Sequence, residues 1–412
     1  MTTKLKIGIV GGSIAGCSAA ILLLRAGHEV VVYERSTGAL VGRGGGIGTP
    51  SSVLNALIEQ DIIDADFPNF TTTTMPFTGR RSSSDQFGHT PWALPLDLRA
   101  FHWSALWNNL RKRVPDDVYR PGQRVVRAEM KDDATVLIQM EDGSEALFDL
   151  VLFADGYQSL GRQQLFPNVG LSFRGYMLWR GLLPEQEMED SVPLGTKVPR
   201  LSHANLPGHT VMYFIPSDTG SIEEGERIFN WAAYMPIAED QLAEFMIDRE
   251  GKHRIGTIPP GKIRIEEENR LKQLAVANLP TYFGEIVSKT QDTYVQLIYT
   301  TDLPAYYRQR ICLIGDAGMV IQPFTGSGVF KGYNNVKDLL DSLADNETIE
   351  AALRQWGAGQ LQTAKRLLVL GAQMEKAFIW DALDFAVADA ETTASWWKAS
   401  VTFPEDFSYE KA

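Results

Sequence analysis

The chain has 412 residues, of which 44% are hydrophobic and 22% are charged, and this composition indicates a soluble globular protein of two or three domains. Its net charge of −12 and the shortness of its densest basic cluster, Arg111-Lys112-Arg113, argue against a nucleic-acid partner, which requires a basic face. No apolar run reaches the ~18 residues that would span a bilayer, so we expect no membrane partner.

The first forty residues have the pattern of a dinucleotide-binding unit. An apolar run, Ile7 to Val10, enters the glycine-rich turn Gly11-Gly12-Ser13-Ile14-Ala15-Gly16. A helix is expected from Cys17 to Leu24, and a second strand from Val30 to Tyr33. A strand, a tight turn, a helix and a second strand form the βαβ unit that holds a pyrophosphate at the helix N-terminus.

Two features of this unit bear on the nucleotide that it binds. Ser13 stands where the pattern G-x-G-x-x-G has its middle glycine. Glu34, at the end of the second strand, is where a carboxylate can accept hydrogen bonds from a ribose diol. Glu34 would also repel a 2′-phosphate, which favours FAD or NAD over NADP, although its neighbour Arg35 weakens that exclusion.

The next segment is predicted to contain a glycine loop, two helices and a hairpin. The cluster Gly42 to Gly48 is either a flexible loop or backbone packed closely against a flat ligand. Ser51 to Gln60 indicates a helix capped by serines, and residues 71–84 indicate an exposed hairpin or loop. The periodicity of Leu98 to Lys112 predicts a second helix.

Residues 125–300 are predicted to contain strands of two different sheets. Val125 to Met130 and Thr135 to Met140 alternate as strands, and the apolar run Leu150 to Ala154 returns to the first sheet before Asp155-Gly156. From about Phe173 to Tyr299, aromatic-rich strands and amphipathic helices indicate a second domain inserted into the first. We expect those strands at 173–183, 210–215 and 228–235, and the helices at 238–248 and 266–278.

The first domain resumes at the apolar run Ile311 to Ile314, which ends in Gly315-Asp316, and helices over about 328–343 and 347–380 follow. We therefore predict an α/β fold with a Rossmann-like FAD-binding domain and an inserted mixed-sheet substrate domain. The FAD-binding domain would comprise residues 1–172 and 301–412, the latter with C-terminal helices and a tail, and the substrate domain residues 173–300. The acidic strand ends at Glu34, Asp155 and Asp316 should meet in one crevice.

With these motifs the chain resembles the group A flavoprotein aromatic hydroxylases, the para-hydroxybenzoate hydroxylase family. The second family motif appears as Asp155-Gly156 with Ser159 and Arg162 downstream, and the third as Gly315-Asp316 followed by Pro323 and Gly326-Ser327-Gly328. Further segments resemble the hydroxypyridine hydroxylases of the family: Gly175 to Gly181, Gly208-His209, Tyr213 and Lys331. Three positions depart from the family pattern, namely Met319, Phe330 and Asn335.

The resemblance implies that FAD is the resident cofactor. Asp316 would bind the ribityl chain, Asp155 would lie near the pyrophosphate and the NAD(P)H approach, and Arg43 and Arg99 would be cations on the phosphate side. N–H groups from Gly326 to Phe330 would face the pyrimidine edge of the flavin. The residues assigned to the cofactor in this way are Gly11, Ser13, Ile14, Ala15, Gly16, Glu34, Arg35, Arg43, Gly46, Ile47, Arg99, Val125, Asp155, Asp316, Gly326, Ser327, Gly328, Val329 and Phe330.

The resemblance also implies the reaction. NADPH or NADH would reduce FAD, O2 would add to the flavin, and the flavin hydroperoxide would hydroxylate a small electron-rich aromatic or hydroxypyridine-type ring. The substrate domain would form the roof over the flavin. The side chains expected to line it are Tyr176, Trp179, Arg180 and Tyr213, with the Pro323 carbonyl touching the substrate. Tyr213 and Pro323 are the catalytic candidates, and His203 and His209 are candidate bases.

Two other classes of function are weighed against this one. A halogenase, an oxidase or another flavin-dependent oxidoreductase could use the same fold, but the Trp-x-Trp-x-Ile-Pro motif of flavin halogenases does not occur. A non-enzymatic NAD-binding protein would leave Asp155-Gly156 and Gly315-Asp316 unexplained. The sequence therefore favours the monooxygenase.

The remaining motifs bear on packing and on the cellular compartment rather than on catalysis. Cys17 and Cys312 lie in apolar segments, and two thiols in a chain of this length indicate a reducing compartment. With no signal peptide before the first strand, we expect a cytoplasmic protein, and a homodimer is possible. No metal-ligand spacing is found. Gly256 to Lys262 fits G-x-x-x-x-G-K by chance, because Ile263 replaces the magnesium-binding Ser or Thr.

Overall fold

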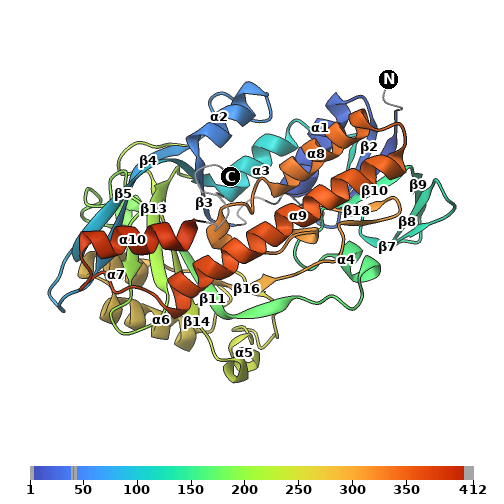
Figure 1. Cartoon of the computed structure of the whole chain (residues 1–412). Coiled ribbons are helices and arrows are strands. Elements are labelled where there is room, and N and C mark those ends of the chain that lie inside the picture. The colour runs from blue at the N-terminus through green and yellow to red at the C-terminus, as the bar shows by residue number, and fades with distance from the viewer. Residues whose placement is uncertain (1–3, 39, 41–43, 403–412) are drawn as a thin grey trace.

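The computed structural model describes residues 4–38, 40 and 44–402 and contains three β-sheets with helices packed around them (Figure 1). The first sheet has six strands, and four of its five strand pairs are parallel. In spatial order its strands are β17 (Tyr307–Arg308), β18 (Ile311–Leu313), β10 (Leu150–Phe153), β1 (Lys6–Val10), β2 (Glu29–Glu34) and β6 (Tyr119–Pro121). This is the Rossmann-like sheet that the sequence predicts.

The parallel register of this sheet brings three distant segments of the chain to one edge. Ile9 pairs with Leu152 and with Val32, and Leu152 pairs in turn with Cys312. These apolar residues are almost fully inaccessible to solvent, as expected of a parallel sheet covered on both faces. The loops that follow β1, β10 and β18 therefore leave the sheet side by side.

The second sheet has nine strands, and all its strand pairs are antiparallel except that of β12 with β4. In spatial order its strands are β15 (Thr257–Ile258), β16 (Tyr294–Thr300), β11 (Ser172–Pro184), β14 (Ile228–Pro236), β13 (His209–Ile215), β12 (Arg200–Ser202), β4 (Phe70–Gly79), β5 (His89–His102) and β3 (Gly46–Pro50). The sheet is mixed, as predicted. It also includes strands from residues 46–102, so it draws on both sides of the predicted boundary at 172, and the division into domains stays a prediction.

The third sheet is a small antiparallel meander. It consists of β7 (Val125–Met130), β8 (Val136–Met140) and β9 (Glu145–Phe148). Its apolar face packs on the first sheet, where the Phe148 ring meets Tyr33 edge-on at 6.1 Å between ring centroids.

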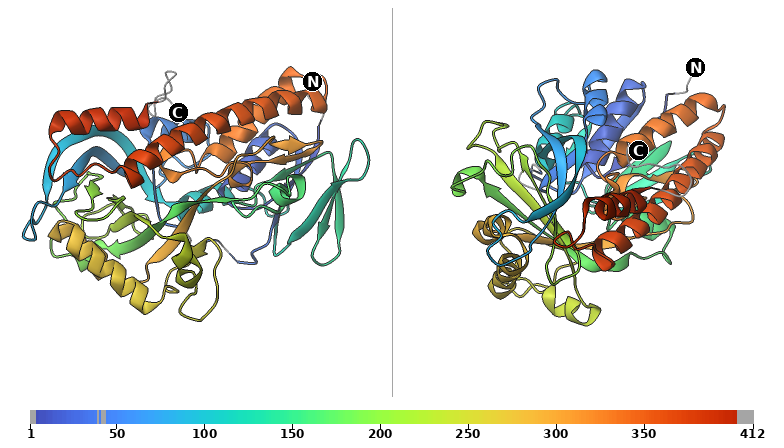
Figure 2. Two further views of the ribbon diagram at one scale, coloured as in Figure 1. Left: turned by 60° about the horizontal axis from the view of Figure 1, so that its bottom comes forward. Right: turned by 60° about the vertical axis from the view of Figure 1, so that its left-hand side comes forward.

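Helices cover both large sheets. Around the first sheet lie α1 (Ile14–Arg25), α2 (Ser51–Glu59), α3 (Trp103–Arg111), α4 (Leu160–Leu165) and α8 (Lys331–Asp345). One face of the second sheet is covered by α5 (Glu239–Phe245), α6 (Ile265–Asn278) and α7 (Thr281–Lys289). Its other face packs against α10 (Ala390–Val401) and the C-terminal half of α9 (Ile349–Glu375), so the sheet is covered on opposite sides by these two groups of helices (Figure 2).

The helix α9 joins the two sheets. Near its start, Trp356 lies in the core of the first sheet, and Gly357 meets the ring of Tyr307 on β17. Near its end, Leu370 and Met374 lie in the core of the second sheet, and a π-helical turn, Lys376–Trp380, follows directly. Figure 1 shows this helix running across the length of the molecule. Both sheets therefore pack on one rigid element.

One helix prediction is wrong at its start. The segment from Leu98 to His102 is the end of β5, and the helix α3 begins only at Trp103. The side chain of His102 caps this helix by accepting a hydrogen bond from the Ser104 N–H at 3.1 Å. The strand arises because β5 pairs with both β3 and β4 along this segment, and sheet pairing overrides the helical periodicity of the sequence.

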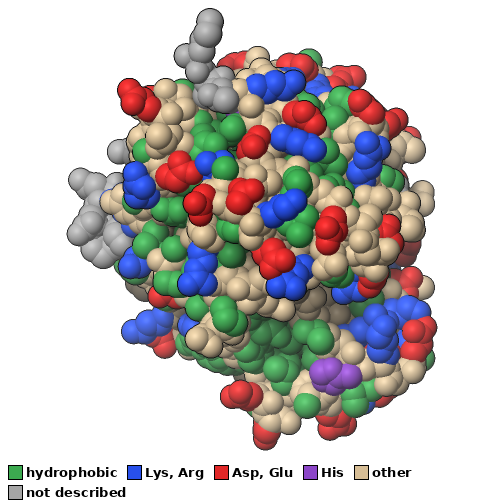
Figure 3. Space-filling model, turned by 90° about the vertical axis from the view of Figure 1, so that its right-hand side faces the viewer, with side chains coloured by type: hydrophobic (Ala, Val, Ile, Leu, Met, Phe, Trp, Pro, Cys, Tyr) green, Lys and Arg blue, Asp and Glu red, His purple; other side chains and the backbone are tan. Residues whose placement is uncertain are grey.

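The surface carries mixed charge on the face drawn in Figure 3. Basic and acidic side chains alternate over most of that face, and hydrophobic side chains gather in a hollow in its lower part. Within the described part of the chain, no helix is both long enough and apolar enough to cross a membrane.

Two glycines in α9 test its packing on the first sheet. A Cβ at Gly357 would lie 2.5 Å from Cε1 of Tyr307, whereas a Cβ at exposed Gly359 would meet nothing within 4 Å. We expect Gly359→Ala to stabilise the protein by about 0.5–1 kcal/mol, the usual gain in helix propensity. Gly357→Ala should instead destabilise it by about 1–3 kcal/mol through overpacking. Urea unfolding of the two variants measures the difference, and equal effects would contradict the described contact.

Candidate active site and cofactor crevice

The loop after β1 is a tight turn that has room for no side chain at two positions. Gly11 has a φ of +106° and donates its N–H to the Tyr33 carbonyl at 2.8 Å. A Cβ at Gly11 would lie 2.5 Å from the carbonyl oxygen of Ala154, and one at Gly16 would lie 1.8 Å from the carbonyl oxygen of Gly11. The first loop thus packs directly on the end of β10.

Ser13 fits this loop without needing the freedom of glycine. Its φ of −81° is ordinary extended backbone, and it is the N-cap of α1. The position without room for a side chain is instead Gly12, where a Cβ would lie 2.3 Å from the hydroxyl of Tyr119. The helix that follows presents the N–H groups of its first turn, including Ile14 and Ala15, which lack partners within a helix and suit an anion.

Glu34 is buried beside this loop. Its Oε2 accepts a hydrogen bond from the Gly12 N–H at 2.8 Å, and its Oε1 accepts one from the Ser36 N–H at 2.8 Å. The neighbouring Arg35 is exposed. Val125 begins β7 close by, since the Gln123 N–H donates to the Glu34 carbonyl at 3.0 Å.

The loop after β10 contains a carboxylate with one unused oxygen. Asp155 accepts a hydrogen bond from the Leu160 N–H at 2.7 Å through Oδ2, while its Oδ1 has no partner within the described residues. Burial raises the pKa of Asp155 above its usual value, although the hydrogen bonds to the carboxylate oppose that change.

The loop after β18 is held from two sides. The Gly315 N–H donates to Asn335 Oδ1 at 2.8 Å, and Asn335 is itself bonded to Gln360 of α9. The Lys331 ammonium group contacts both the Asp316 carboxylate and the Met319 carbonyl. The Asp316 side chain is 51% exposed, so part of its carboxylate remains accessible to a ligand despite the contact with Lys331.

A buried arginine joins the second loop to the third. Arg162, at the start of α4, is 2% exposed, and its Nη1 donates to the carbonyls of Ala317 at 3.1 Å and Asp316 at 3.3 Å. Its Nη2 donates to the carbonyl of Tyr157. Sequence reasoning placed Arg162 in the second family motif but gave it no role, because main-chain acceptors leave no trace in a sequence.

The contact between the first and third loops completes this arrangement. A Cβ at Gly315 would lie 2.9 Å from the Cβ of Ala15, and one at Gly332 in α8 would lie 2.5 Å from the same atom. The helices α1 and α8 therefore lie side by side (Figure 1). The loops that carry the three acidic strand ends therefore lie together at one edge of the first sheet, where the sequence predicts the cofactor crevice.

The segment between the third loop and α8 is a chain of turns. Pro323 is exposed, and its carbonyl accepts a hydrogen bond from the Gly326 N–H at 3.2 Å. Gly326 is left-handed, with a φ of +67°. Ser327, Gly328, Val329 and Phe330 follow before α8 begins at Lys331, three residues later than predicted. Val329 and Phe330 pack against the core of the first sheet.

The glycine cluster at 44–48 packs against the second sheet. The Gly46 N–H donates to Asn230 Oδ1 at 2.7 Å, and the Gly46 carbonyl accepts from Arg180 Nη2 at 2.8 Å. A Cβ at Gly45 would lie 2.4 Å from the Tyr294 hydroxyl. Gly45 and Gly46 therefore pack closely against protein side chains, and the packing of this backbone against a flat ligand stays a prediction.

Three further residues in or near this cluster were assigned to the cofactor from the sequence, and the structure describes two of them. Ile47 packs against the core of the first sheet. Arg99 lies on β5, where its guanidinium donates to the hydroxyls of Ser51 and Thr71. Arg43 lies outside the described residues. The roles of these residues toward FAD stay predictions.

One face of the second sheet gathers polar side chains. Because side chains alternate along a strand, Tyr176, Leu178 and Arg180 share this face of β11 with Tyr213 of β13 and Asn230 of β14. Burial raises the pKa of Tyr213 to about 12, so this phenol stays protonated at neutral pH and can donate a hydrogen bond.

Trp179 is on the opposite face of β11. Its side chain is 3% exposed and meets the Phe245 ring edge-on, with 5.6 Å between the ring centroids. Tyr176, Arg180 and Tyr213 thus share one face of the second sheet, whereas Trp179 lies in the core beneath α5–α7. The sequence alone could not separate them, since adjacent positions in a strand point in opposite directions whichever face is buried.

His209 is engaged on both ring nitrogens. Its Nδ1 donates to the Phe378 carbonyl at 3.1 Å, so Nε2 is the acceptor for Nη1 of Arg200 at 2.6 Å. Burial and the adjacent Arg200 charge hold the pKa of His209 well below its usual value. A histidine that already accepts from a guanidinium is a poor proton acceptor.

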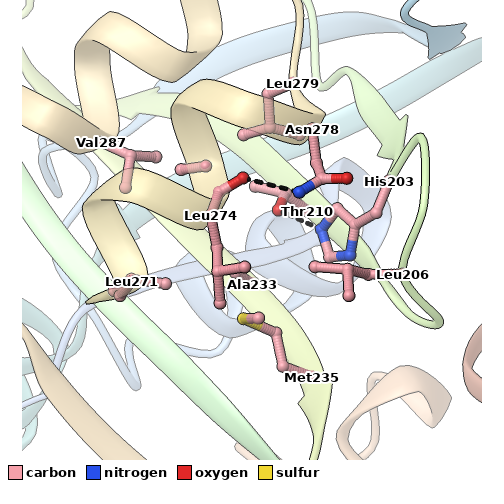
Figure 4. Close-up of a pocket in the computed structure, with 11 residues that line it drawn as sticks. His203, Leu206, Thr210, Ala233, Met235, Leu271, Leu274, Asn278, Leu279 and Val287 are labelled. Atoms are coloured by element: carbon pink, nitrogen blue, oxygen red, sulfur yellow. Dashed lines mark hydrogen bonds between the residues drawn. The ribbon is translucent and has the colours of Figure 1, made fainter. Parts of the chain in front are cut away.

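His203 lies on the face of the second sheet that packs under α6 and α7. Its Nε2 bonds to Thr210 Oγ1 at 2.9 Å, and it borders a small apolar cavity of about 10 Å³ under α6 and α7 (Figure 4). Burial lowers the pKa of His203 to about 4. It is therefore separated from the polar face that carries Tyr213.

The crevice fits a flavin dinucleotide. The glycine positions 11 and 16 leave backbone where a side chain would clash, and the free Oδ1 of Asp155 and the accessible Asp316 carboxylate supply acceptors. The start of α1 supplies N–H groups for a diphosphate. These residues would hold the two phosphates and the ribityl chain, as the family motifs imply.

The buried histidine predicts a loss of stability in acid. The unfolded chain takes up a proton near pH 6.5, whereas folded His203 does so only near pH 4, so lowering the pH through this range favours unfolding. At pH 5 we expect His203 to account for about 2 kcal/mol of the stability lost relative to pH 7.5. His203→Gln should flatten the urea-derived profile by that amount. A profile identical to that of the parent protein would contradict the described burial.

Comparisons with known proteins agree with this geometry. A family model described as an NAD(P)-binding Rossmann-like domain matches residues 9–43, and one described as FAD binding domain-like matches residues 173–300. The first matched segment contains the glycine loop after β1, and the second contains β11, β13 and β14, whose polar face carries Arg180, Tyr213 and Asn230.

The chain is also similar to characterised enzymes over most of its length. It is 27% identical to 2,6-dihydroxypyridine 3-monooxygenase of Paenarthrobacter nicotinovorans over 87% of each chain, and 22% identical to a salicylate hydroxylase of Pseudomonas putida over 95% of this chain and 96% of that one. The solved structure of 2,6-dihydroxypyridine-3-hydroxylase from Arthrobacter nicotinovorans matches it with a TM-score of 0.83 and 25% identity, over 93% of this chain and 95% of that one. The chain is therefore similar, over most of its length, to FAD-dependent aromatic hydroxylases.

Proposed function

We propose that this enzyme hydroxylates a small electron-rich ring, a phenol or hydroxypyridine, which binds as its oxyanion on the polar face of the second sheet. The names of its relatives, 2,6-dihydroxypyridine 3-monooxygenase and salicylate hydroxylase, describe enzymes that act on hydroxylated rings. The chain's own support comes from Arg180 and its neighbours.

The proposal rests on the surroundings of the Arg180 guanidinium. Arg180 forms no ion pair among the described residues, and its Nε is buried without a hydrogen-bond partner. Its remaining contacts are the Gly46 carbonyl and the Tyr294 ring, whose centroid is 5.7 Å away. Burying a cation without a counter-ion costs free energy, so this position favours the binding of an anionic ligand.

The phenols around Arg180 can donate hydrogen bonds to the same anionic ligand. Burial raises the pKa of both Tyr213 and Tyr294, so these hydroxyls are neutral donors at physiological pH. The Tyr294 hydroxyl and Asn230 Nδ2 are buried without partners in the described chain. Two phenols, an amide and a guanidinium can therefore bind a ring oxygen as its oxyanion and keep the ring electron-rich.

The protein's part in the reaction is to bind, orient and shield. Bound FAD supplies the redox chemistry, taking electrons from NAD(P)H and delivering one oxygen atom of O2 to the ring. Arg180 would hold the substrate oxyanion, and Tyr213 would fix its orientation by a hydrogen bond. The apolar side chains of Phe324 and Leu178 beside this face would exclude water. The carbonyl of the exposed Pro323 would accept a hydrogen bond from a hydroxyl or N–H group of the ring.

Two further predictions remain part of this proposal. We expect a cytoplasmic protein, from its two free, buried cysteines and the absence of a disulfide among the described residues. A homodimer is compatible with the exposed apolar side chains of Val369 and Trp380 on the outer side of α9 and the turn after it.

The direct test of the activity is oxygen incorporation. Purified protein with bound FAD is mixed with NADH or NADPH and a series of phenols and hydroxypyridines under ¹⁸O2. We expect stimulated NAD(P)H oxidation and one ¹⁸O atom in the product. Peroxide with no hydroxylated product for any ring would indicate an oxidase, and a halogenated product in the presence of halide would indicate a halogenase.

The variant Arg180→Gln tests how the ring is bound. It keeps a hydrogen-bond donor but removes the charge, and a charge-assisted hydrogen bond is typically worth about 1.5–3 kcal/mol. We expect kcat/KM for the hydroxyaromatic to fall about 10- to 100-fold, with Arg180→Lys restoring part of the loss. The exposed Arg124→Gln, which removes only an ion pair with Glu141, is the matched control. A kcat/KM unchanged in Arg180→Gln would contradict the oxyanion site.

A further inference from the structure

One backbone carbonyl in the first loop accepts hydrogen bonds from three separate parts of the chain. The Gly12 oxygen accepts from the Trp107 indole N–H at 3.0 Å, from the Tyr119 hydroxyl at 3.1 Å and from the Cys17 thiol at 3.3 Å. Carbonyl oxygens have two lone pairs, so this acceptor is saturated. The family motifs account for the glycines here but not for these three donors.

All three donors are buried and come from elements that pack against the loop. Trp107 lies on α3 and is 5% exposed, Tyr119 begins β6 and is 6% exposed, and Cys17 lies on α1 and is fully buried. Burial raises the pKa of Cys17 to about 12, so it remains a thiol and can donate. Neither indole nor phenol can reorient without unpacking its core.

The position of this carbonyl fixes the direction of a neighbouring N–H. The Gly12 carbonyl and the Ser13 N–H belong to one planar trans peptide unit, in which they point in opposite directions. Three donors hold the carbonyl inward, toward the core of the first sheet. The Ser13 N–H must therefore point outward, into the crevice at the start of α1.

The other side of the same loop is held as firmly. The Gly12 N–H donates to buried Glu34 Oε2 at 2.8 Å, so both peptide groups around Gly12 are immobilised. Glycine is required here for space rather than for backbone freedom, because a Cβ would overlap the Tyr119 hydroxyl at 2.3 Å. The loop is thus arranged before any ligand binds, which lowers the ordering cost of binding an anion.

We propose that Trp107 and Tyr119 are positioning residues for the FAD diphosphate: by holding the Gly12 carbonyl they aim the Ser13 N–H at a phosphate oxygen. Neither residue touches the cofactor in this account, and both act through one peptide plane. The inference concerns the cofactor alone and stands whichever ring the enzyme hydroxylates.

The experiment uses single and double variants of the full-length protein. Trp107→Phe and Tyr119→Phe each remove one donor, and Tyr119→Phe removes only an oxygen atom. Trp231→Phe is the matched control, because the buried Trp231 indole donates at 2.8 Å to Thr290 in the second sheet, far from the crevice in the chain topology. The FAD dissociation constant comes from flavin fluorescence, and ³¹P NMR of the FAD-loaded protein reports the environment of the diphosphate.

We expect each single variant to bind FAD about three- to tenfold more weakly and the double variant about 10- to 100-fold more weakly, as for the loss of one and two hydrogen bonds. The ³¹P resonances of bound FAD should shift in both single variants. Trp231→Phe should lower thermal stability but leave the dissociation constant within about twofold and the resonances unmoved.

Two results would overturn the proposal. One is a Tyr119→Phe variant, the least disruptive of the set, that binds FAD like the parent protein with unchanged ³¹P resonances. The other is an equal loss of FAD affinity in Trp231→Phe, which would make the effect one of general stability. If the double variant fails to fold, Tyr119→Phe alone decides between these outcomes.

Discussion

The close contact of three loops at one edge of the parallel sheet is the constraint on which the site depends. Side chains are missing where the loops touch: a Cβ at Gly11 would strike Ala154, and one at Gly315 would strike Ala15. The buried Arg162 guanidinium then ties the second loop to the third through main-chain carbonyls. These contacts use main-chain atoms, so one oxygen of the Asp155 carboxylate stays without a partner among the described residues and the Asp316 side chain stays half exposed.

The second sheet supplies chemistry that the first sheet lacks. Its polar face carries Arg180, Tyr213 and Asn230, while its other face is a continuous apolar core under α6 and α7. The glycine segment at 44–46 crosses to this face and bonds to Arg180 and Asn230. The helix α9 packs on both sheets, so the crevice and the polar face are held by one rigid element.

The sequence predicted the parts of the fold in which local pattern and tertiary structure agree. The βαβ unit, the buried strand before Asp155 and the strand before Gly315 each combine an apolar run with a glycine turn, and all three were found in the predicted sheet. The start of the helix at Leu98 was wrong because pairing of β5 on both sides decides that segment. No local pattern carries that information.

The candidate site was predictable to a similar degree. Motifs identified the acids and glycines of the three loops that meet at the edge of the first sheet, but not the partners that position them. Trp107, Tyr119 and Arg162 act on backbone carbonyls, and a backbone acceptor has no sequence signature. Period-two alternation likewise could not tell whether Trp179 or its neighbours face the ligand, since both faces of β11 are buried.

We expect the loops after β1, β10 and β18 to enclose one FAD molecule. Hydrogen–deuterium exchange of the protein with and without FAD tests it directly. Residues 11–16, 155–162 and 315–331 should gain protection together at one FAD per chain, while α5, under the other face of the second sheet, should be unchanged. Protection of only one of these loops, or protection confined to other segments, would contradict it.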